Sequence, residues 1–307
     1  MNKIIVLGCG YIGTNLSNYI VNNFDAQVTV VGIENEYTEY LNKNVKFLPK
    51  RIEQINSEDQ DMFKDAIIID AVGNINATDD IKKSSMIFIQ NCTNKIELIN
   101  KFSTFKTKKY IFLSSGGTVY NDSSLPHKED EKLDPSSIYA LEKVIIENYL
   151  KILHQEIEGF NYLILRLSNP YGGITSKYKR QGIVDVAISK ILNNEELDLY
   201  GKLENVRDYI YIDDISKIIY NLGVSKYKND IFNIGSGIGI SLKELFNIIE
   251  KEFDKKINYK LKPINTINIK SNVLDMSKTR KAINIYNLNS IDEGIKLIKK
   301  IILKSKK

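Results

Sequence analysis

The chain has 307 residues, of which 43% are apolar, which is enough to build one large domain or two modest ones around a hydrophobic core. No run approaches the ~18 consecutive apolar residues of a membrane span, and Cys9 and Cys92 have neither metal-ligand spacing nor the density of a disulfide scaffold. The net charge of +5 is spread along the chain apart from a lysine-rich run at 299–307, so we expect a solvated basic end and no nucleic-acid or membrane partner. Because a strand pattern starts at Lys3 and leaves no room for a signal peptide, we expect a cytoplasmic protein.

Short apolar runs of strand length recur along the first half of the chain with helical stretches between them. The runs cover residues 3–7, 28–31, 66–69, 110–113 and 162–165. We predict helices over about 12–22 and 91–102, and another that Ser136 or Ser137 caps. This alternation is typical of a parallel sheet covered by helices on both faces. We therefore predict an α/β fold with a Rossmann-type doubly wound parallel sheet.

After the segment 169–173 the pattern changes, and a second, smaller α/β region is expected. Its predicted elements are helices over 183–192, 241–253 and 291–303, and strands over 208–212 and 230–234. We divide the chain into a dinucleotide-binding domain over 1–168, to which 205–236 contributes, and a substrate-binding region over 169–307. The active cleft is expected between them.

The first apolar run leads directly into a glycine motif, Gly8-Cys9-Gly10-Tyr11-Ile12-Gly13, that precedes a helical pattern. In this context a G-x-G-x-x-G segment forms a tight turn that brings bare backbone N–H groups and a helix N-terminus up to a pyrophosphate. We therefore predict that the motif binds a dinucleotide, with Gly8, Gly10, Tyr11, Ile12 and Gly13 as the contacting residues.

The choice of dinucleotide depends on the end of the second strand, where a carboxylate usually holds the adenosine ribose. Gly32 occupies that place, and Glu34 follows it. Glu34 either reaches the ribose hydroxyls or is a solvated loop charge. Because no arginine follows that would bind a 2′-phosphate, we expect NAD, with NADP as the alternative.

Tyr139 and Lys143 form a Y-x-x-x-K pattern, and a spacing of four residues places both on one side of a helix. A phenol is a poor base at neutral pH unless a nearby cation stabilises its anion. Lys143 supplies such a cation. The pair could then accept a proton from a substrate hydroxyl while hydride passes to a nicotinamide, and the alternative is an exposed tyrosine beside an exposed lysine.

Taken in order, these segments resemble the extended short-chain dehydrogenases/reductases, the NAD-dependent nucleotide-sugar epimerase/dehydratase family typified by UDP-glucose 4-epimerase. The resemblance covers nearly the whole chain. It is carried by the glycine motif, by the Y-x-x-x-K pair, and by the segments L-S-S-G-G-T-V-Y at 113–120, R-L-S-N-P-Y-G at 166–172 and V-R-D-Y-I-Y-I-D-D at 206–214.

The resemblance implies roles for individual residues. Tyr139 would be the catalytic acid/base, Lys143 would also hold the nicotinamide ribose, and Asn169 and Arg207 would contact the substrate diphosphate. The family's usual Ser or Thr near the catalytic tyrosine is Gly116 here. Ser115 or Thr118 must therefore supply that hydroxyl, unless the hydrogen bond is absent.

The expected reaction is oxidoreduction at C4 of a nucleotide-diphosphate sugar, in the biosynthesis of sugars for surface polysaccharides. A 4-epimerase is favoured; a net 4-dehydrogenase or 4-ketoreductase is the alternative, and a non-catalytic dinucleotide-sensing protein is a further one. A 4,6-dehydratase is disfavoured, because the family's Asp-Glu pair is Gly117-Thr118 here. With two histidines and no cysteine cluster, no metal site is expected. By resemblance, helices over about 91–102 and 137–153 would pair two subunits into a homodimer or a higher homo-oligomer.

Overall fold

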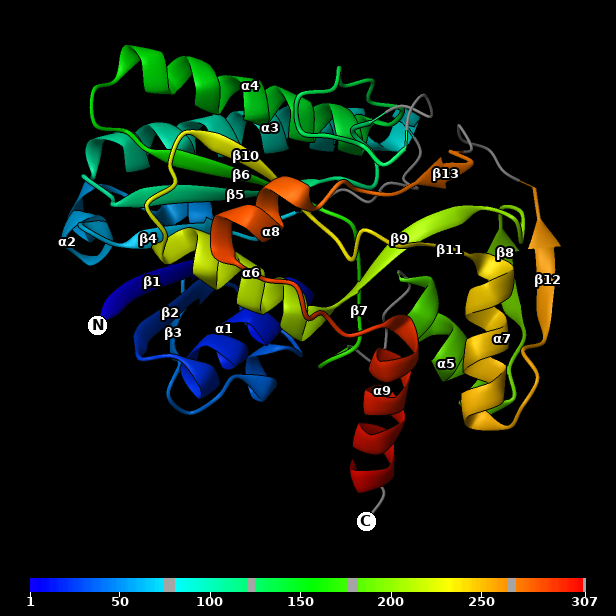
Figure 1. The fold of residues 1–307 in the computed structure, drawn as a ribbon. Coiled ribbons are helices and arrows are strands. Elements are labelled where there is room, and N and C mark those ends of the chain that lie inside the picture. Colours follow the sequence, from blue (N-terminus) through cyan, green and yellow to red (C-terminus); the bar gives the residue numbers. More distant parts are fainter. Residues whose placement is uncertain (74–80, 121–124, 176–181, 264–268, 306–307) are drawn as a thin grey trace.

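The structure is a computed structural model, and it describes residues 1–73, 81–120, 125–175, 182–263 and 269–305 (Figure 1). Its centre is a seven-stranded sheet in the order β10-β6-β5-β4-β1-β2-β3, in which every neighbouring pair is parallel. The strands are β1 (Asn2–Leu7), β2 (Ala26–Gly32), β3 (Lys46–Pro49), β4 (Ile67–Asp70), β5 (Lys109–Ser115), β6 (Tyr162–Leu167) and β10 (Asp230–Ile234).

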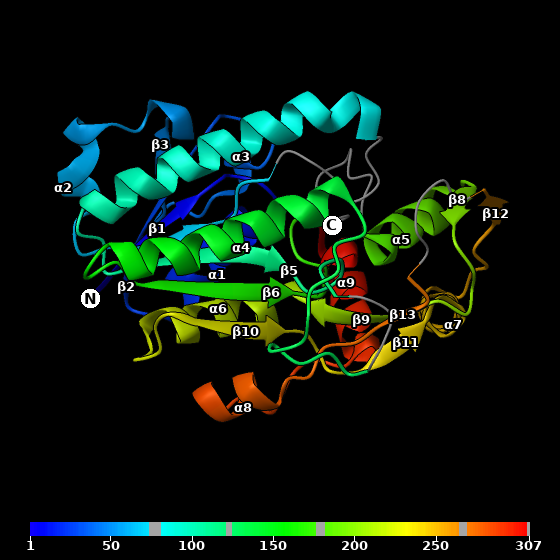
Figure 2. The ribbon, with the colours of Figure 1, turned by 90° about the horizontal axis from the view of Figure 1, so that it is seen from above.

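Helices cover both faces of this sheet (Figures 1 and 2). On one face lie α3 (Ile81–Thr104) and α4 (Ile138–Glu156), which pack against each other. On the other face lie α1 (Tyr11–Asn23), α6 (Ile212–Val224) and α8 (Ser277–Ile283). The short α2 (Gln60–Phe63) precedes β4, and 3₁₀ turns occupy Thr38–Tyr40, Ile52–Gln54 and Ser57–Asp59. The predicted doubly wound parallel sheet is confirmed.

The inner strands form where the sequence predicts them because they are apolar on both faces. All residues of β4, β5 and β6 are buried, as expected for strands sandwiched between two helical layers. Of the two serines proposed as the cap of α4, Ser137 is the N-cap, and its hydroxyl accepts a hydrogen bond from the Ala140 N–H at 3.1 Å.

The second region carries a smaller mixed sheet, and helices pack beside it. In the sheet, β9 (Val206–Tyr211) pairs with β7 (Asn169–Tyr171), β11 (Gly239–Ser241) and β13 (Ser271–Asn272), and nearby β8 (Leu197–Tyr200) pairs with β12 (Tyr259–Lys262). Helices α5 (Ile183–Asn193), α7 (Leu242–Phe253) and α9 (Ile291–Ser305) share a core with these strands.

The predicted strand over 208–212 begins two residues late and ends one residue late, because β9 spans Val206–Tyr211. Ile212 is the first residue of α6, and the chain changes direction at Tyr211, which is extended and serves as the N-cap. Asp213 and Asp214 follow in the first turn, where carboxylates favour a helix N-terminus. Sequence analysis also missed α6 itself and the short strands of the second region.

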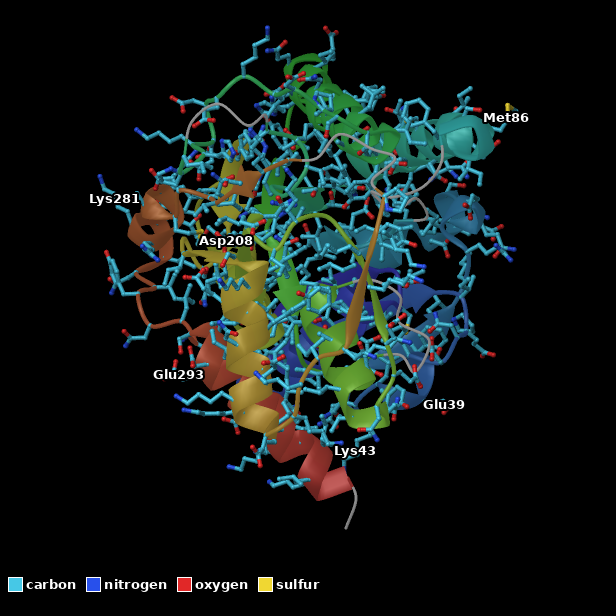
Figure 3. All side chains as sticks on the ribbon, turned by 90° about the vertical axis from the view of Figure 1, so that its right-hand side faces the viewer. Glu39, Lys43, Met86, Asp208, Lys281 and Glu293 are labelled. Carbon is cyan, nitrogen blue, oxygen red and sulfur yellow. The ribbon has the colours of Figure 1, made fainter. Side chains whose placement is uncertain are left out.

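Asp208 of β9 joins the two parts of the molecule. Its carboxylate is fully buried and accepts hydrogen bonds from the Ser236 N–H at 2.8 Å, the Gly237 N–H at 3.1 Å and the Leu274 N–H at 3.3 Å. In Figure 3 Asp208 lies within the outline of the molecule, whereas Met86 and Glu39 lie at its edge. Burial raises the pKa of Asp208, and these donors oppose the shift.

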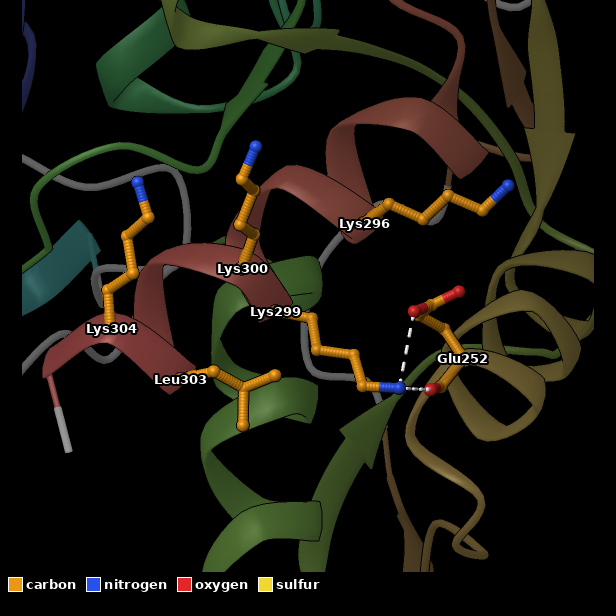
Figure 4. Close-up of a pocket in the computed structure, with 6 residues that line it drawn as sticks. All are labelled: Glu252, Lys296, Lys299, Lys300, Leu303 and Lys304. Atoms are coloured by element: carbon orange, nitrogen blue, oxygen red, sulfur yellow. Dashed lines mark hydrogen bonds and ion pairs between the residues drawn. The ribbon is translucent and has the colours of Figure 1, made fainter. Parts of the chain in front are cut away.

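A hollow of about 390 Å³ lies between α9 and the end of α7 (Figure 4). Four lysines of α9 line it, and Lys299 pairs with Glu252 at 3.3 Å. None of its lining residues lies on the elements that carry the predicted site residues. No helix within the described ranges combines the length and apolar content that crossing a bilayer requires.

Candidate active site

The glycine motif forms the turn between β1 and α1. Gly8 has a φ of +97°, a conformation that side chains disfavour, and its N–H donates to the Val31 carbonyl at 2.8 Å. Gly13 lies so close to this turn that a Cβ there would stand 2.0 Å from the Gly8 oxygen. A larger residue at position 13 would therefore force the turn apart.

The same turn has room for an anion. A Cβ built on Gly10 would meet no heavy atom of the described residues within 4 Å, and Gly10 caps α1 without a side-chain hydrogen bond. Open space at a helix N-terminus with exposed backbone donors suits a pyrophosphate. The residues present thus fit the dinucleotide that the sequence predicts.

The end of β2 packs against this turn. A Cβ on Gly32 would lie 3.0 Å from the Cys9 nitrogen, so a carboxylate side chain has little space there. Asn35 instead supports the turn, donating to the Cys9 carbonyl at 2.8 Å. Glu34 is exposed on the same loop, and its contact with a ribose stays a prediction. Sequence analysis missed Asn35.

Tyr11 and Ile12 are the first residues of α1, and their side chains make contacts within the protein. Ile12 packs on the core, and the Tyr11 hydroxyl donates to the Gly172 carbonyl at 2.9 Å. Asn15 exchanges two hydrogen bonds with the backbone of Ile174, at 2.8 and 2.9 Å. Any contact of Tyr11 and Ile12 with the cofactor would therefore use their backbone, while α1 holds the segment that follows β7.

Tyr139 and Lys143 lie together in the first turns of α4, above the carboxyl end of β5. The Lys143 Nζ stands 5.5 Å from the centre of the Tyr139 ring and donates to the Leu113 carbonyl at 3.2 Å. Lys143 is only 5% exposed, whereas Tyr139 is half-buried. The ammonium is thus fixed to the sheet beneath a phenol that a ligand can approach.

The other predicted hydroxyls lie at the same strand end. Ser115 is the last residue of β5, and the Thr118 hydroxyl donates to its Oγ at 2.9 Å, or accepts from it. Gly116, between them, has no room for the usual Ser or Thr, because a Cβ there would lie 2.6 Å from the Leu274 Cδ1. Leu274, which sequence analysis missed, fills that space.

Asn169 and Arg207 lie on the paired strands β7 and β9. The Asn169 amide donates to the Asp208 carbonyl at 2.8 Å, and a Cβ on Gly117 would lie 3.9 Å from the Asn169 Oδ1. Asn169 therefore lies beside the loop that follows β5. The Arg207 guanidinium donates to the Ile269 carbonyl at 2.7 Å and to the Val206 carbonyl at 2.8 Å.

A buried network fixes the strands beneath the site. Arg166 of β6 is 1% exposed and pairs with Glu147 of α4 at 2.7 Å, and Ser114 of β5 donates to the same carboxylate at 2.6 Å. Arg166 also donates to the Tyr120 hydroxyl at 2.8 Å. Burial raises the pKa of Tyr120 to about 12, so it stays neutral. The arginine of the R-x-x-N-P-Y-G segment is thus structural.

Among the residues that the structure describes, no three His, Cys, Asp or Glu side chains gather as metal ligands would. The glycine turn, the Tyr139–Lys143 pair and the Ser115 and Thr118 hydroxyls lie along the carboxyl edge of the sheet. Known proteins are similar to this chain in both sequence and fold.

Residues 4–235 match the model of the NAD dependent epimerase/dehydratase family. The protein belongs to this family. The match reaches all seven strands of the large sheet, and it confirms the predicted family and NAD as the predicted cofactor.

Two relatives indicate the range of reactions among similar proteins. An Escherichia coli dTDP-4-dehydro-6-deoxyglucose reductase is 39% identical over 196 residues, which are 63% of this chain but only 61% of the reductase. A putative UDP-glucose 4-epimerase of Methanocaldococcus jannaschii is 30% identical over 255 residues, 81% of each chain.

Two solved structures share the whole fold. The UDP-glucose 4-epimerase of Thermotoga maritima, determined with UDP-glucose, has a TM-score of 0.85 at 28% identity and covers 99% of this chain and 100% of its own. The UDP-N-acetylglucosamine 4-epimerase of Methanobrevibacter ruminantium, in complex with UDP-N-acetylmuramic acid, has a TM-score of 0.84 at 25% identity and covers 99% of both chains. The predicted smaller C-terminal α/β part is confirmed with the rest of the fold.

Proposed function

We propose that this protein oxidises and re-reduces C4 of a nucleotide-diphosphate sugar, acting as a 4-epimerase. The observation that carries the proposal is the Tyr139–Lys143 pair, with the buried Lys143 ammonium tied to the Leu113 carbonyl and 5.5 Å from the half-buried phenol ring. The pair stands at the carboxyl edge of the sheet, where ligands of doubly wound folds bind.

In this proposal Tyr139 accepts the proton of the sugar 4-hydroxyl and later returns it. A bound nicotinamide would supply the other half of the chemistry, as the acceptor of hydride from C4 and its donor to the opposite face of the 4-keto sugar. Lys143 stabilises the phenolate and, by resemblance, holds the nicotinamide ribose. Thr118 and Ser115, already hydrogen-bonded to each other, offer the hydroxyl that Gly116 lacks.

Binding of the diphosphate is assigned to Asn169 and Arg207. A planar guanidinium donates in a fixed fork that suits phosphate oxygens. The bond from Arg207 to the Ile269 carbonyl orients that fork and reduces the freedom lost when a ligand binds. Asn169 adds a neutral donor beside the Gly117 backbone.

A second candidate is the 4-ketoreductase direction. The observation that favours it is the 39% identity to the Escherichia coli reductase, above that of the epimerase-like relatives named here. An epimerase returns hydride to the same sugar and keeps its cofactor oxidised between turnovers, whereas a reductase consumes one reduced dinucleotide for each product.

The test is a panel of UDP-, dTDP- and GDP-sugars with the purified protein, analysed for epimeric products and for absorbance of reduced nicotinamide. A 4-epimeric product without added reductant supports the epimerase. Stoichiometric oxidation of NADH by 4-keto nucleotide sugars supports the reductase. If no sugar reacts and denaturation releases no dinucleotide, the proposed function is wrong.

We also propose that the protein forms a homodimer through α3 and α4. These helices expose apolar side chains away from the sheet, and Figure 3 shows Met86 at the edge of the molecule. The exposed set is Met86, Ile87 and Ile89 on α3 and Leu141 and Ile152 on α4. Sedimentation should show a dimer that Ile89→Glu weakens, and a monomer at all concentrations would refute it.

A further inference from the structure

A buried ion pair lies beside the catalytic pair, and neither the sequence analysis nor the proposed reaction uses it. Lys95 of α3 contacts both carboxylate oxygens of Asp70 at the end of β4, at 2.6 and 2.7 Å. The two residues are 5% and 1% exposed. The carboxylate also accepts hydrogen bonds from the Val72 N–H at 3.1 Å and from the Tyr110 hydroxyl.

This pair lies on the same face of the sheet as Lys143 and one strand away. Asp70 is in register with Phe112 on β5, and Lys143 lies over the Phe112 ring with its Nζ 4.9 Å from the ring centre. The Lys143 ammonium is therefore held near Asp70, yet it donates to the Leu113 carbonyl and leaves the carboxylate to Lys95.

Four of the elements around this position, β4, β5, α3 and α4, contribute ionisable groups. Asp70 comes from β4, Tyr110 from β5, Lys95 and Cys92 from α3, and Tyr139, Glu142 and Lys143 from α4. Asn91 donates to the Glu142 carboxylate at 3.3 Å. Burial lowers the pKa of Lys95, Asp70 opposes that shift, and the Lys143 charge adds to it, so the two ammonium groups interact.

The end of β4 also contacts the glycine turn. The Ala71 N–H donates to the Leu7 carbonyl at 3.0 Å, and a Cβ on Gly8 would lie 3.1 Å from Val72. Removal of Lys95 would leave the buried Asp70 carboxylate without its cation, one strand away from Lys143 and next to the segment that contacts the cofactor turn.

We propose that Lys95 is a positioning residue for the catalytic pair: by neutralising Asp70, it keeps the Lys143 ammonium on the Leu113 carbonyl and beneath Tyr139. Lys95 touches no reacting atom in this scheme. It acts by occupying the anion that would otherwise attract Lys143. The inference rests on the proposed function, because it assigns Tyr139 and Lys143 to catalysis.

The test compares Lys95→Met with the Lys95→Met/Asp70→Asn double variant. In Lys95→Met the unpaired carboxylate opposes a phenolate and draws Lys143 away, so the pH of half-maximal activity on the acid limb rises by about one unit. On that limb kcat falls about tenfold, with KM for the nucleotide sugar unchanged. In the double variant both charges are gone, and the half-maximal pH returns to the wild-type value.

Lys101→Met is the matched control. Lys101 lies on the same helix and reaches the Glu53 carbonyl at 3.5 Å, outside this cluster, so the substitution should leave the pH profile in place. Should Lys95→Met fail to fold, Lys95→Gln keeps one donor for Asp70 without the charge and is expected to shift the profile in the same direction. An unshifted profile in the folded variant, or an equal shift in the double variant, would overturn the proposal.

A second readout does not depend on turnover. The ultraviolet phenolate absorbance that Tyr139→Phe removes is titrated with pH in the wild-type and Lys95→Met backgrounds. The Lys95→Met background should need a higher pH to form the phenolate, even if no sugar in the panel reacts. Failure of the proposed function and failure of this inference are thereby distinguished.

Discussion

Gly116 offers a sharp test of how this site is built, because the family's usual hydroxyl can be restored there. In Gly116→Ser the new Cβ would lie 2.6 and 2.9 Å from the two Leu274 methyl carbons and 3.2 Å from the Arg166 carbonyl. Leu274 has no exposed surface and packs against Val119 and Tyr120. Overpacking of this kind costs about 1–3 kcal/mol, and we expect a loss of unfolding free energy in that range.

A double-mutant cycle tests whether the collision with Leu274 causes that loss of unfolding free energy. Leu274→Ala alone should cost about 2–5 kcal/mol, because it removes a buried side chain and leaves a cavity. Combined with Gly116→Ser, it removes the colliding methyl groups, so the double variant should lose about 1–2 kcal/mol less than the sum of the single losses. Urea unfolding followed by circular dichroism measures all three values.

Gly117→Ser is the matched control, since its new Cβ would approach the described residues no closer than 3.9 Å, at Asn169. It should change the unfolding free energy by less than about 0.5 kcal/mol. If Gly116→Ser is as mild as Gly117→Ser, or is strictly additive with Leu274→Ala, Leu274 does not explain the missing hydroxyl.

Three further predictions concern other parts of the structure. Gly13→Ala should lower the thermal unfolding midpoint and abolish NAD binding in calorimetry, because its Cβ would lie 2.0 Å from the Gly8 oxygen. Gly10→Ala places its Cβ in open space, so it should abolish NAD binding but leave the unfolding midpoint unchanged. Arg207→Lys should raise KM for the nucleotide sugar about tenfold in steady-state kinetics with kcat nearly unchanged, and a change confined to kcat would contradict a role in binding. Burial lowers the pKa of Lys109 from 10.5 to about 8, so between these values the unfolded chain binds more protons and the unfolding free energy rises with pH. Lys109→Met should remove that rise in urea titrations, and an unchanged pH dependence would refute the assignment.

The central sheet could be predicted because its strands are continuous apolar runs. Such a run must be buried on both faces, and an inner strand of a parallel sheet between two helical layers provides that burial. Ile67–Asp70 and Tyr162–Leu167 illustrate this, since every residue of both is buried. The strands β11 and β13 could not, because they are two or three residues long and their pairing with β9 is set by contacts distant in the sequence.

The residues of the candidate site likewise include some that local sequence spacing predicts and others that only the folded structure brings together. Gly8, Gly13, Tyr139 and Lys143 were recognisable because their chemistry depends on local spacing in one turn or one helix. Leu274 was not, because its effect on Gly116 exists only once the segment after β13 folds against the end of β5.

The Lys95–Asp70 pair left one trace in the sequence. Asp70 directly follows an apolar run, which is a signal for a charge at a buried strand end, whereas the burial of Lys95 is known only from the structure. Their contact depends on tertiary packing between residues 25 positions apart, which no local pattern encodes.

The most direct test of Tyr139 as the catalytic acid/base is a single-turnover assay of Tyr139→Phe with NAD and a nucleotide sugar that the wild-type protein converts. Loss of the proton acceptor should slow formation of reduced nicotinamide by about 10²–10⁴-fold while NAD binding stays intact. A rate equal to that of the wild-type protein would contradict Tyr139 as the acid/base and, with it, the proposed chemistry at C4.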